Sequence, residues 1–544
     1  MRYVFVFAIL VCAAASVGSA QNPPPSSQTP VFRTDARLVH VSIVVQDGRG
    51  RPVTGLTADD FELFDQGDKQ QVTLFSVEGS ASSAPAAAGT NIITNRLDGP
   101  AASGVTVLLY DRLNTRQEHQ SIARRHIIEY LRQLRPEGRV GLYVLEGGAV
   151  RVLHDFTRDA SSLLKAIERA ENRTTPELAG SEDLLPRGED FGLLEDGAAM
   201  EQWMAQADAH IQGFFTERRI RATTDAIEGV ARHLAGVRGR KNVIWISSGF
   251  PIRFNSGIQF GGAMFETSSG PEIFRATRAL NDADIAFYTV DARGLVGAFS
   301  TPANARQQQF TTLDGVMRDV ESSQVIAEQT GGRAYFNTND LGGAIKRAAE
   351  DSRLTYVLGY YPSHAEWDGN FREIKVRVKR RGVSVRHRKG YFALPPEVPA
   401  PTERLKAIVE AFKSPLDATG VGLSVSFASG NESDEVALTI RVEPEAVVLT
   451  PNGSVWAGSM DVAIAQTLPD GSLVRSLDIT VPLELPEPAR RQLLVDGLTL
   501  NRTIILRADA HQVKVAVRND AGAIGTVTIP ASRLTPLLKQ GRRP

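Results

Sequence analysis

The sequence has almost no cysteine, with one residue, Cys12, in a chain of 544. Cys12 lies in an apolar N-terminal segment that we expect to be cleaved, so the mature chain would carry no thiol. This excludes disulfides, a cysteine nucleophile and cysteine-ligated zinc from the mature protein. Val11 precedes Cys12 where a lipoprotein signal would need a small residue, so lipidation is not expected. Proteins with large cores do not require disulfides for stability.

The chain also lacks an excess of charge of either sign. It holds 61 Lys and Arg against 62 Asp and Glu, a formal net charge of -1. No global field favours nucleic acid or an anionic membrane, so neither is predicted as a partner. The hydrophobic fraction of 42% is typical of globular proteins. The length is sufficient for roughly three or four domains.

Long apolar runs are absent except at the N-terminus. One positive charge at Arg2 precedes an apolar stretch at 4–15, which Gly18-Ser19-Ala20 follow as small residues. This pattern predicts a signal peptide at 1–20, cleaved before Gln21, and therefore an exported protein, periplasmic or secreted. An uncleaved membrane anchor is the alternative. No later segment reaches ~18 apolar residues, so no integral membrane segment is expected after cleavage.

Changes in composition and periodicity divide the chain into several regions. After the signal peptide we expect a Pro/Ser-rich linker (21–31), an N-terminal β module (32–79), a flexible linker (80–102), an α/β domain (103–353), a second β module (354–393), a Pro-rich linker (394–402) and a C-terminal β-sandwich domain (403–544). The two β modules are each too small to be stable alone. They are predicted either to pair into one sandwich with the α/β domain inserted between them, or to form independent modules.

The α/β region alternates buried strands with amphipathic helices. Continuous apolar runs at 105–110, 242–247 and 285–290 are typical of parallel strands that are buried on both faces. The alternation predicts a doubly wound sheet with helices on both faces and one antiparallel edge strand after Gly147-Gly148. Three long loops, at 171–222, 248–270 and 292–324, are expected on the side of the sheet where the strands have their carboxyl ends. Such loops predict a binding surface there, although insertions without a partner are the alternative.

Several motifs in the α/β region resemble the von Willebrand factor A (VWA) domain family. They are LLYDRLNT at 108–115, RGRKNVIWISSGFP at 238–251, AFYTVDARGL at 286–295 and AEQTGGRAYFNTNDLGGAI at 327–345. The upstream segment 45–67 and YVLGYYPS at 356–363 look like the flanking modules of the VWFA-related proteins of acidobacteria. The resemblance implies a VWA-like, Rossmann-like domain flanked by β-sandwich or Ig-like modules, and a protein partner.

The VWA resemblance further implies a metal-ion-dependent adhesion site, in which Asp-x-Ser-x-Ser, a later Thr and an Asp after the fourth strand hold Mg²⁺ through hard oxygen ligands. Here Asp111 and Thr115 fit the first and third positions of that motif, but Leu113 cannot ligate a metal. The Thr position falls on Thr223 or Thr224. Ser247-Ser248-Gly249 stands where the second Asp is expected, so that carboxylate is missing.

The candidate metal ligands of this degenerate site are therefore Asp111, Thr115, Thr223 and Ser248. The site either keeps a weak Mg²⁺ or other divalent cation that depends on the partner, or Asp111 has a structural role in capping or local pairing. We favour the structural role and predict no other cofactor.

No established catalytic motif occurs in the sequence, which contains no HExxH, GxSxG or phosphate-binding glycine loop. We therefore predict no catalytic residues and a protein-binding role of the adhesion or scaffold type. The alternatives are an envelope hydrolase that uses Asp111, Glu146 and Asp291 at the carboxyl edge of the sheet, and a purely structural envelope component. The oligomeric state is not predicted.

A basic cluster follows the α/β region, and we predict a solvated hairpin face for it, with a patch for an acidic partner or lipid headgroups as the alternative. Its members are Arg377, Lys379, Arg380, Arg381, Arg386, Arg388 and Lys389.

Overall fold

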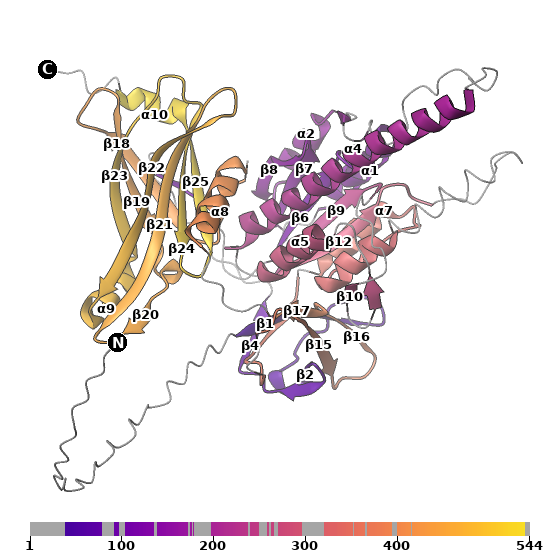
Figure 1. The fold of residues 1–544 in the computed structure, drawn as a ribbon. Helices are drawn as coiled ribbons and strands as arrows, with labels where there is room; N and C mark the ends of the chain where they lie inside the picture. The colour runs from indigo at the N-terminus through magenta and orange to yellow at the C-terminus, as the bar shows by residue number, and fades with distance from the viewer. Residues whose placement is uncertain are drawn as a thin grey trace, which may run out of the picture. The chain divides into compact units, whose positions relative to one another are not determined.

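The structure is a computed structural model. It describes residues 38–78, 92–96, 104–134, 139–171, 175–176, 178, 197–237, 240–249, 258–260, 263–265, 270–295, 320–351, 353–364, 367–393, 400–414 and 416–538. The predicted signal peptide (1–20) and the linker at 21–31 lie outside the described residues. The fold is mixed α/β with several antiparallel sheets (Figure 1).

A six-stranded sheet forms the centre of the α/β domain, in the order β13-β12-β9-β6-β7-β8. Its strands are β6 (Val105–Asp111), β7 (Arg139–Glu146), β8 (Ala149–Thr157), β9 (Lys241–Ser247), β12 (Ile285–Asp291) and β13 (Ala334–Tyr335). All neighbours are parallel except β7 and β8, which are joined by the turn at Gly147-Gly148. The carboxyl ends of the five parallel strands therefore share one edge of the sheet, called the carboxyl edge below.

Two hydrophobic clusters cover the two faces of this sheet. Leu108 and Tyr110 of β6 pack with α1 (Gln117–Arg132), α2 (Ala160–Glu168) and α7 (Leu341–Glu350). Val107 and Leu109, which alternate with them, pack with α4 (Gly197–Leu234) and α5 (Gly270–Asp282). Because successive side chains of a strand point to opposite faces, one apolar run supplies both cores.

Helix α4 corrects the prediction of a long loop at 171–222. The helix begins at Gly197, so Thr223 lies inside it rather than at the end of a loop. The first half is rich in Ala and Gln, which favour helix, but its Trp203 and Phe214 are exposed. Its few apolar residues form a stripe narrower than the apolar face of a core helix, so the sequence pattern did not predict a helix in this half. The other two predicted loops are shortened by the hairpin of β10 (Ile258–Phe260) and β11 (Ala263–Phe265) and by a helix at 320–329.

Strands from before and after the α/β domain form one two-sheet unit, called the β unit below. One sheet has the order β16-β1-β14-β4 and the other β17-β15-β2-β3. Their bounds are β1 (Val39–Asp47), β2 (Phe61–Asp65), β3 (Asp68–Gln70), β4 (Leu74–Glu78), β14 (Thr355–Tyr360), β15 (Phe371–Val378), β16 (Val383–Arg386) and β17 (Gly390–Phe392). A single apolar core lies between the sheets, and the α/β domain is an insertion between β4 and β14.

Two arginines of the predicted solvated hairpin face are structural instead. The Arg386 guanidinium pairs with Asp351 at 2.6 Å, and Arg388 donates to the backbone oxygens of His40 and Asn281. Asp351 and Asn281 belong to the α/β domain, so these arginines fasten it to the β unit. The remaining basic residues of the cluster are exposed, in agreement with the sequence pattern.

The C-terminal domain opens with α8 (Pro401–Lys413) and continues as two antiparallel sheets. They have the orders β23-β19-β18-β5 and β20-β21-β24-β25, with β22 paired to β21. The elements are β18 (Leu423–Ser429), β19 (Glu435–Val442), β20 (Thr450–Asn452), β21 (Val455–Thr467), β22 (Leu473–Leu485), α9 (Glu487–Asp496), β23 (Leu498–Ile505), β24 (Gln512–Asn519), β25 (Ile524–Pro530) and α10 (Ala531–Leu538).

Strand β5 (Ile92–Thr94) corrects part of the predicted flexible linker at 80–102. It pairs with β18, although its Thr94 bonds to Leu423, 329 positions further along the chain. The buried Asn95 side chain explains why this segment is ordered. Its amide donates to the backbone oxygens of Ala418 and Val421 at 2.8 Å, and its oxygen accepts from the Leu423 N–H. The rest of the linker lies outside the described residues.

The buried His233 of α4 predicts a loss of stability in mild acid. Its Nε2 lies 2.9 Å from the Tyr143 hydroxyl and its Nδ1 lies 2.6 Å from the Asp417 backbone oxygen. Burial lowers the pKa of His233 below its ordinary value of about 6.5, so the folded state favours the neutral ring. As the pH falls below about 6.5, the unfolded chain binds a proton that the folded chain does not, and each pH unit then removes up to about 1.4 kcal/mol.

Urea denaturation between pH 8 and pH 5 measures this effect. A His233→Gln variant is expected to lose less stability over this range than the wild type, whereas a variant of the exposed His40, His40→Gln, keeps the wild-type slope. An identical pH dependence in the His233→Gln variant would contradict the assignment.

Candidate functional site

The candidate residues lie where three neighbouring strands end at the carboxyl edge. Asp111 is the last residue of β6, Ser247 of β9 and Asp291 of β12. Ligand sites of open α/β sheets form at this edge, where the loops that follow the strands come together.

Asp111 is fully buried and its carboxylate is held by hydrogen bonds from the protein. Oδ1 accepts from the Asn114 backbone N–H, and Oδ2 accepts from Asn114 Nδ2 and Trp245 Nε1, each at 2.9 Å. Burial raises the pKa of Asp111, whereas hydrogen bonds from Asn114, Ser247 and Trp245 act in the opposite direction. The carboxylate therefore has a structural role, in turning the chain after β6 and tying it to β9.

The Asn114 side chain bridges Asp111 and Thr223. Its Nδ2 lies 2.9 Å from Asp111 Oδ2 and 2.9 Å from Thr223 Oγ1, so one amide group donates to both. The Asn114 oxygen accepts from Arg219 Nε at 3.3 Å. The donors of an amide thus occupy the space between two of the predicted metal ligands.

Thr115 and Ser248 form a second contact between the same loops. The Ser248 backbone N–H donates to Thr115 Oγ1 at 3.1 Å, and Thr115 Oγ1 lies 3.5 Å from Ser247 Oγ. Ser248 Oγ accepts from the Arg116 N–H at 3.3 Å. These hydroxyls hold the loop 111–116 against the end of β9.

These residues do not fit a Mg²⁺ ion. Mg²⁺ requires several hard oxygen acceptors in an octahedral arrangement, but Asp111 is the one carboxylate among the four candidate ligands and its oxygens already accept hydrogen bonds from Asn114 and Trp245. Leu113 is a fully buried core residue. Within the part of the chain that the structure describes, no three His, Cys, Asp or Glu side chains are grouped so that they could hold a metal.

Sequence reasoning missed the roles of Asn114 and Trp245. Asn114 occupies a variable position of the Asp-x-Ser-x-Ser pattern, and Trp245 belongs to an apolar run that only predicts a buried strand. A signal was present in both, because a buried amide and a buried indole N–H each need a partner.

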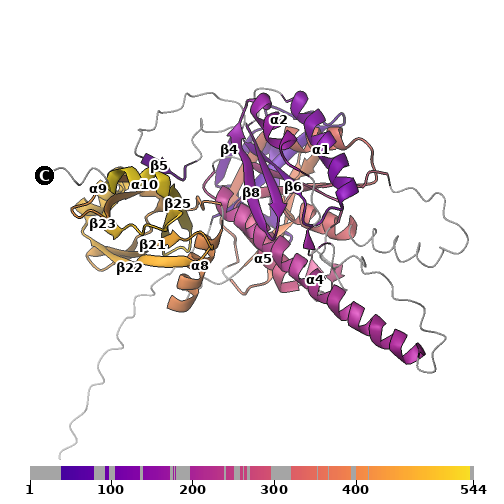
Figure 2. The ribbon, with the colours of Figure 1, turned by 90° about the horizontal axis from the view of Figure 1, so that it is seen from above.

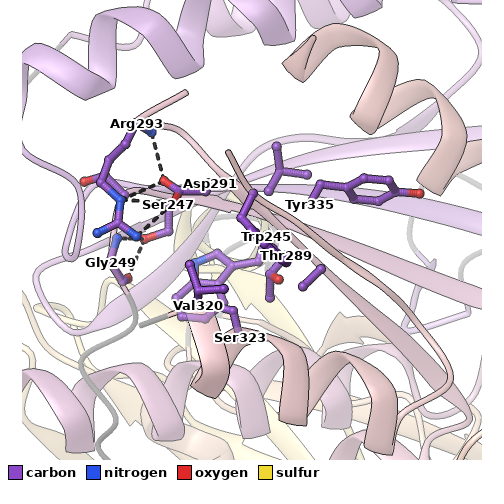
Figure 3. A pocket seen from close by; sticks show the side chains of 13 residues that line it. Trp245, Ser247, Gly249, Thr289, Asp291, Arg293, Val320, Ser323 and Tyr335 are labelled. Atoms are coloured by element: carbon purple, nitrogen blue, oxygen red, sulfur yellow. Dashed lines mark hydrogen bonds and ion pairs between the residues drawn. The ribbon is translucent and has the colours of Figure 1, made fainter. Parts of the chain in front are cut away.

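The other two carboxylates of the hydrolase alternative have arginine partners of their own. Asp291 is paired with Arg293, whose Nε and Nη2 both lie 2.9 Å from carboxylate oxygens. Figure 3 shows this guanidinium folded back over the Asp291 carboxylate. Glu146 contacts Arg112 Nη1 at 2.6 Å and Arg151 Nη2 at 2.9 Å. Each of these two carboxylates is therefore paired with arginine, Asp291 within its own loop and Glu146 with arginines of the loop after β6 and of β8.

A small hollow lies beside Asp291 at the carboxyl edge (Figure 3). Its volume is about 20 Å³, room for about one water molecule. Its lining includes Trp245, Ser247, Asp291, Arg293, Tyr335 and Phe336. The Phe336 side chain is exposed, and so is that of Leu295, whose backbone N–H donates to Asn339 Oδ1 at 3.1 Å. Two apolar side chains on neighbouring loops thus reach solvent next to an arginine–carboxylate pair.

Comparison with known proteins leaves the family unassigned, since no family model and no curated protein match this chain. Among solved structures, the SpRpn10 VWA domain is similar at 15% identity over 35% of this chain and 75% of that chain, with a TM-score of 0.16. Two structures of the pilus adhesin SpaC from Lactobacillus rhamnosus GG, one in the open conformation, are 8% identical over 88% and 89% of this chain, with TM-scores of 0.25 and 0.26. This chain spans 58% and 57% of their length.

VWA membership therefore stays a prediction from the sequence motifs. In the described residues, no helix has both the length and the apolarity needed to cross a membrane.

Proposed function

We propose that this chain is an exported protein-binding protein of the adhesion or scaffold type, and that it recognises its partner at the carboxyl edge of the α/β sheet. One observation carries the proposal: the exposed Phe336 and Leu295 lie on neighbouring loops beside the Asp291–Arg293 pair. Aromatic side chains and arginine are the residues that contribute most to binding energy at protein interfaces.

Recognition at this edge proceeds without a metal ion in our proposal. The Asn114 amide supplies Asp111 and Thr223 with the partners that a cation would otherwise provide. The loop 111–116 is thereby fixed before any partner arrives, which reduces the entropy lost on binding. The β unit and the C-terminal domain act as the scaffold, and export rests on the predicted signal peptide.

The hydrogen bonds and ion pairs of Asp111, Glu146 and Asp291 support a binding role better than a catalytic one. A general base must be able to accept a proton from the substrate. Asp111, Glu146 and Asp291 each accept hydrogen bonds from separate neighbours, and no pair of them shares a hydrogen-bond partner in the contacts described above. The hydrolase and the purely structural component remain alternative hypotheses.

Site-specific photo-crosslinking in intact cells tests the proposal. A photoreactive phenylalanine analogue at position 336 is expected to give a discrete protein adduct, and adding EDTA is expected to leave its yield unchanged. The same analogue at Val495, an exposed apolar residue of α9, is the matched control and should give no such adduct.

Three outcomes would count against the proposal. An adduct at both positions would show non-specific contact, and none at position 336 would remove the binding surface. An adduct that disappears with EDTA would show that a metal takes part.

A further inference from the structure

The first half of α4 carries an apolar stripe that none of the described core residues covers. Trp203, Ile211 and Phe214 are 66%, 42% and 57% exposed. Figures 1 and 2 both show this half of the helix running beyond the sheet. From Ile220 onward the same helix is buried in the α/β core. The exposure is therefore confined to the projecting half.

The stripe has the spacing of a helix–helix seam. Positions 203, 207, 211, 214 and 218 follow one another at intervals of four, four, three and four residues. At 100° per residue they fall within an arc of about 80°. Intervals of three and four place residues on the face that a second helix covers in a coiled coil.

We infer that this stripe pairs with the same stripe of a second copy of the chain, with the two α4 helices antiparallel. The sequence is complementary to itself in that arrangement. A two-fold axis near His210 and Ile211 places Trp203 opposite Arg218 of the other copy, and Ala207 opposite Phe214. The small alanine leaves room for the phenylalanine ring, and the arginine provides a cation for the indole face.

A contact between arginine and an aromatic ring, of the kind proposed between the two copies, already occurs within one chain. The Arg218 guanidinium lies 5.8 Å from the centre of the Phe214 ring. A two-fold contact of this kind is isologous, so each favourable pair occurs twice and the assembly closes at two copies.

The size of the stripe sets the expected strength of the pairing. The exposed parts of Trp203, Ile211 and Phe214 amount to about 700 Å² for the two copies together, which is less than stable specific interfaces bury and is typical of weak, reversible contacts. We therefore expect a reversible dimer with a dissociation constant on the order of micromolar. This inference does not rest on the proposed function, because α4 contributes nothing to the hollow at the carboxyl edge.

Sedimentation equilibrium of the mature chain, from about 1 to 200 µM, tests the inference. The wild type is expected to pass from monomer to dimer over this range. Trp203→Ala and Phe214→Ala should each raise the dissociation constant at least tenfold, as expected for aromatic residues at the centre of a small interface. Val495→Ala, which removes an apolar side chain that is even more exposed, should leave the dissociation constant unchanged.

Either of two results would overturn the inference. A dimer that both α4 variants retain at full strength must use another surface. A wild type that stays monomeric at 200 µM excludes a second copy as the occupant. Hydrogen exchange of that monomer would then show whether another segment of the chain protects residues 203–214.

Discussion

Replacing Asp351 with alanine is expected to lower the free energy of unfolding by about 3–5 kcal/mol, because the change leaves a buried guanidinium without its counter-ion. Asp351 is almost completely buried. Its Oδ2 lies 2.7 Å from the Tyr288 hydroxyl and 2.6 Å from Arg386 Nη1, and its Oδ1 accepts from Gln46 Nε2 at 2.8 Å. Three donors from two structural units thus lose one common acceptor.

Urea denaturation of the wild type and variant measures this loss, and a double variant separates its cause. Adding Arg386→Met to Asp351→Ala removes the unpaired charge and should restore a large part of the stability. Asp340→Ala, which removes an exposed N-cap of α7, is the control and should cost about 1 kcal/mol. A loss from Asp351→Ala no larger than that of the control would show that the network does not hold the two units together.

Replacing Asp111 with alanine is expected to lower the free energy of unfolding by about 3 kcal/mol, with or without added Mg²⁺. The change leaves the Asn114 backbone N–H and the Trp245 indole N–H buried without acceptors, at about 1–3 kcal/mol each. Burial raises the pKa of Asp111, so the folded state spends free energy on keeping this carboxylate charged. Removing the carboxylate recovers that free energy and offsets part of the loss.

Thermal unfolding with and without 10 mM Mg²⁺, Mn²⁺ or Ca²⁺ distinguishes the structural role from a metal site. Neither the wild type nor the variant is expected to gain stability from these ions. Thr223→Val is the matched control and should cost about 1 kcal/mol, since it removes one acceptor of the Asn114 amide. If a metal ion stabilised the wild type in a saturable way, and Asp111→Ala lost that gain, the structural role would be wrong. The hypothesis of an adhesion-type metal site would then hold.

The strands of the α/β sheet could be predicted from the sequence because a strand buried on both faces is a continuous run of apolar residues. The runs predicted at 105–110 and 242–247 correspond to β6 and β9 within one residue at each end. The first half of α4 could not be predicted in this way, since its apolar residues face solvent rather than the core. Strand β5 was missed for a different reason: three residues in an Ala- and Ser-rich stretch have no periodicity, and their order depends on Asn95 contacts far away in the sequence.

The candidate site, too, could be predicted from the sequence only in part. The resemblance to VWA domains singled out Asp111 and Thr223, and the structure brings both to Asn114 Nδ2. It brings Thr115 and Ser248 to each other instead. The position of the Asn114 side chain depends on the turn that follows β6, and a turn's side-chain directions are set by backbone angles that residue spacing does not specify.

The insertion of the α/β domain between two adjacent strands has a mechanical consequence. The chain leaves the β unit at Glu78 and returns at Thr355, which are register partners in the antiparallel pair of β4 and β14. Tension applied to the chain before β1 and after β17 is carried by the hydrogen bonds that join β1 to β14 and β16. While those ladders hold, tension between these two points does not run through the backbone of the inserted domain, and it reaches that domain only through contacts with the C-terminal domain, such as β5 with β18 and His233 with Asp417.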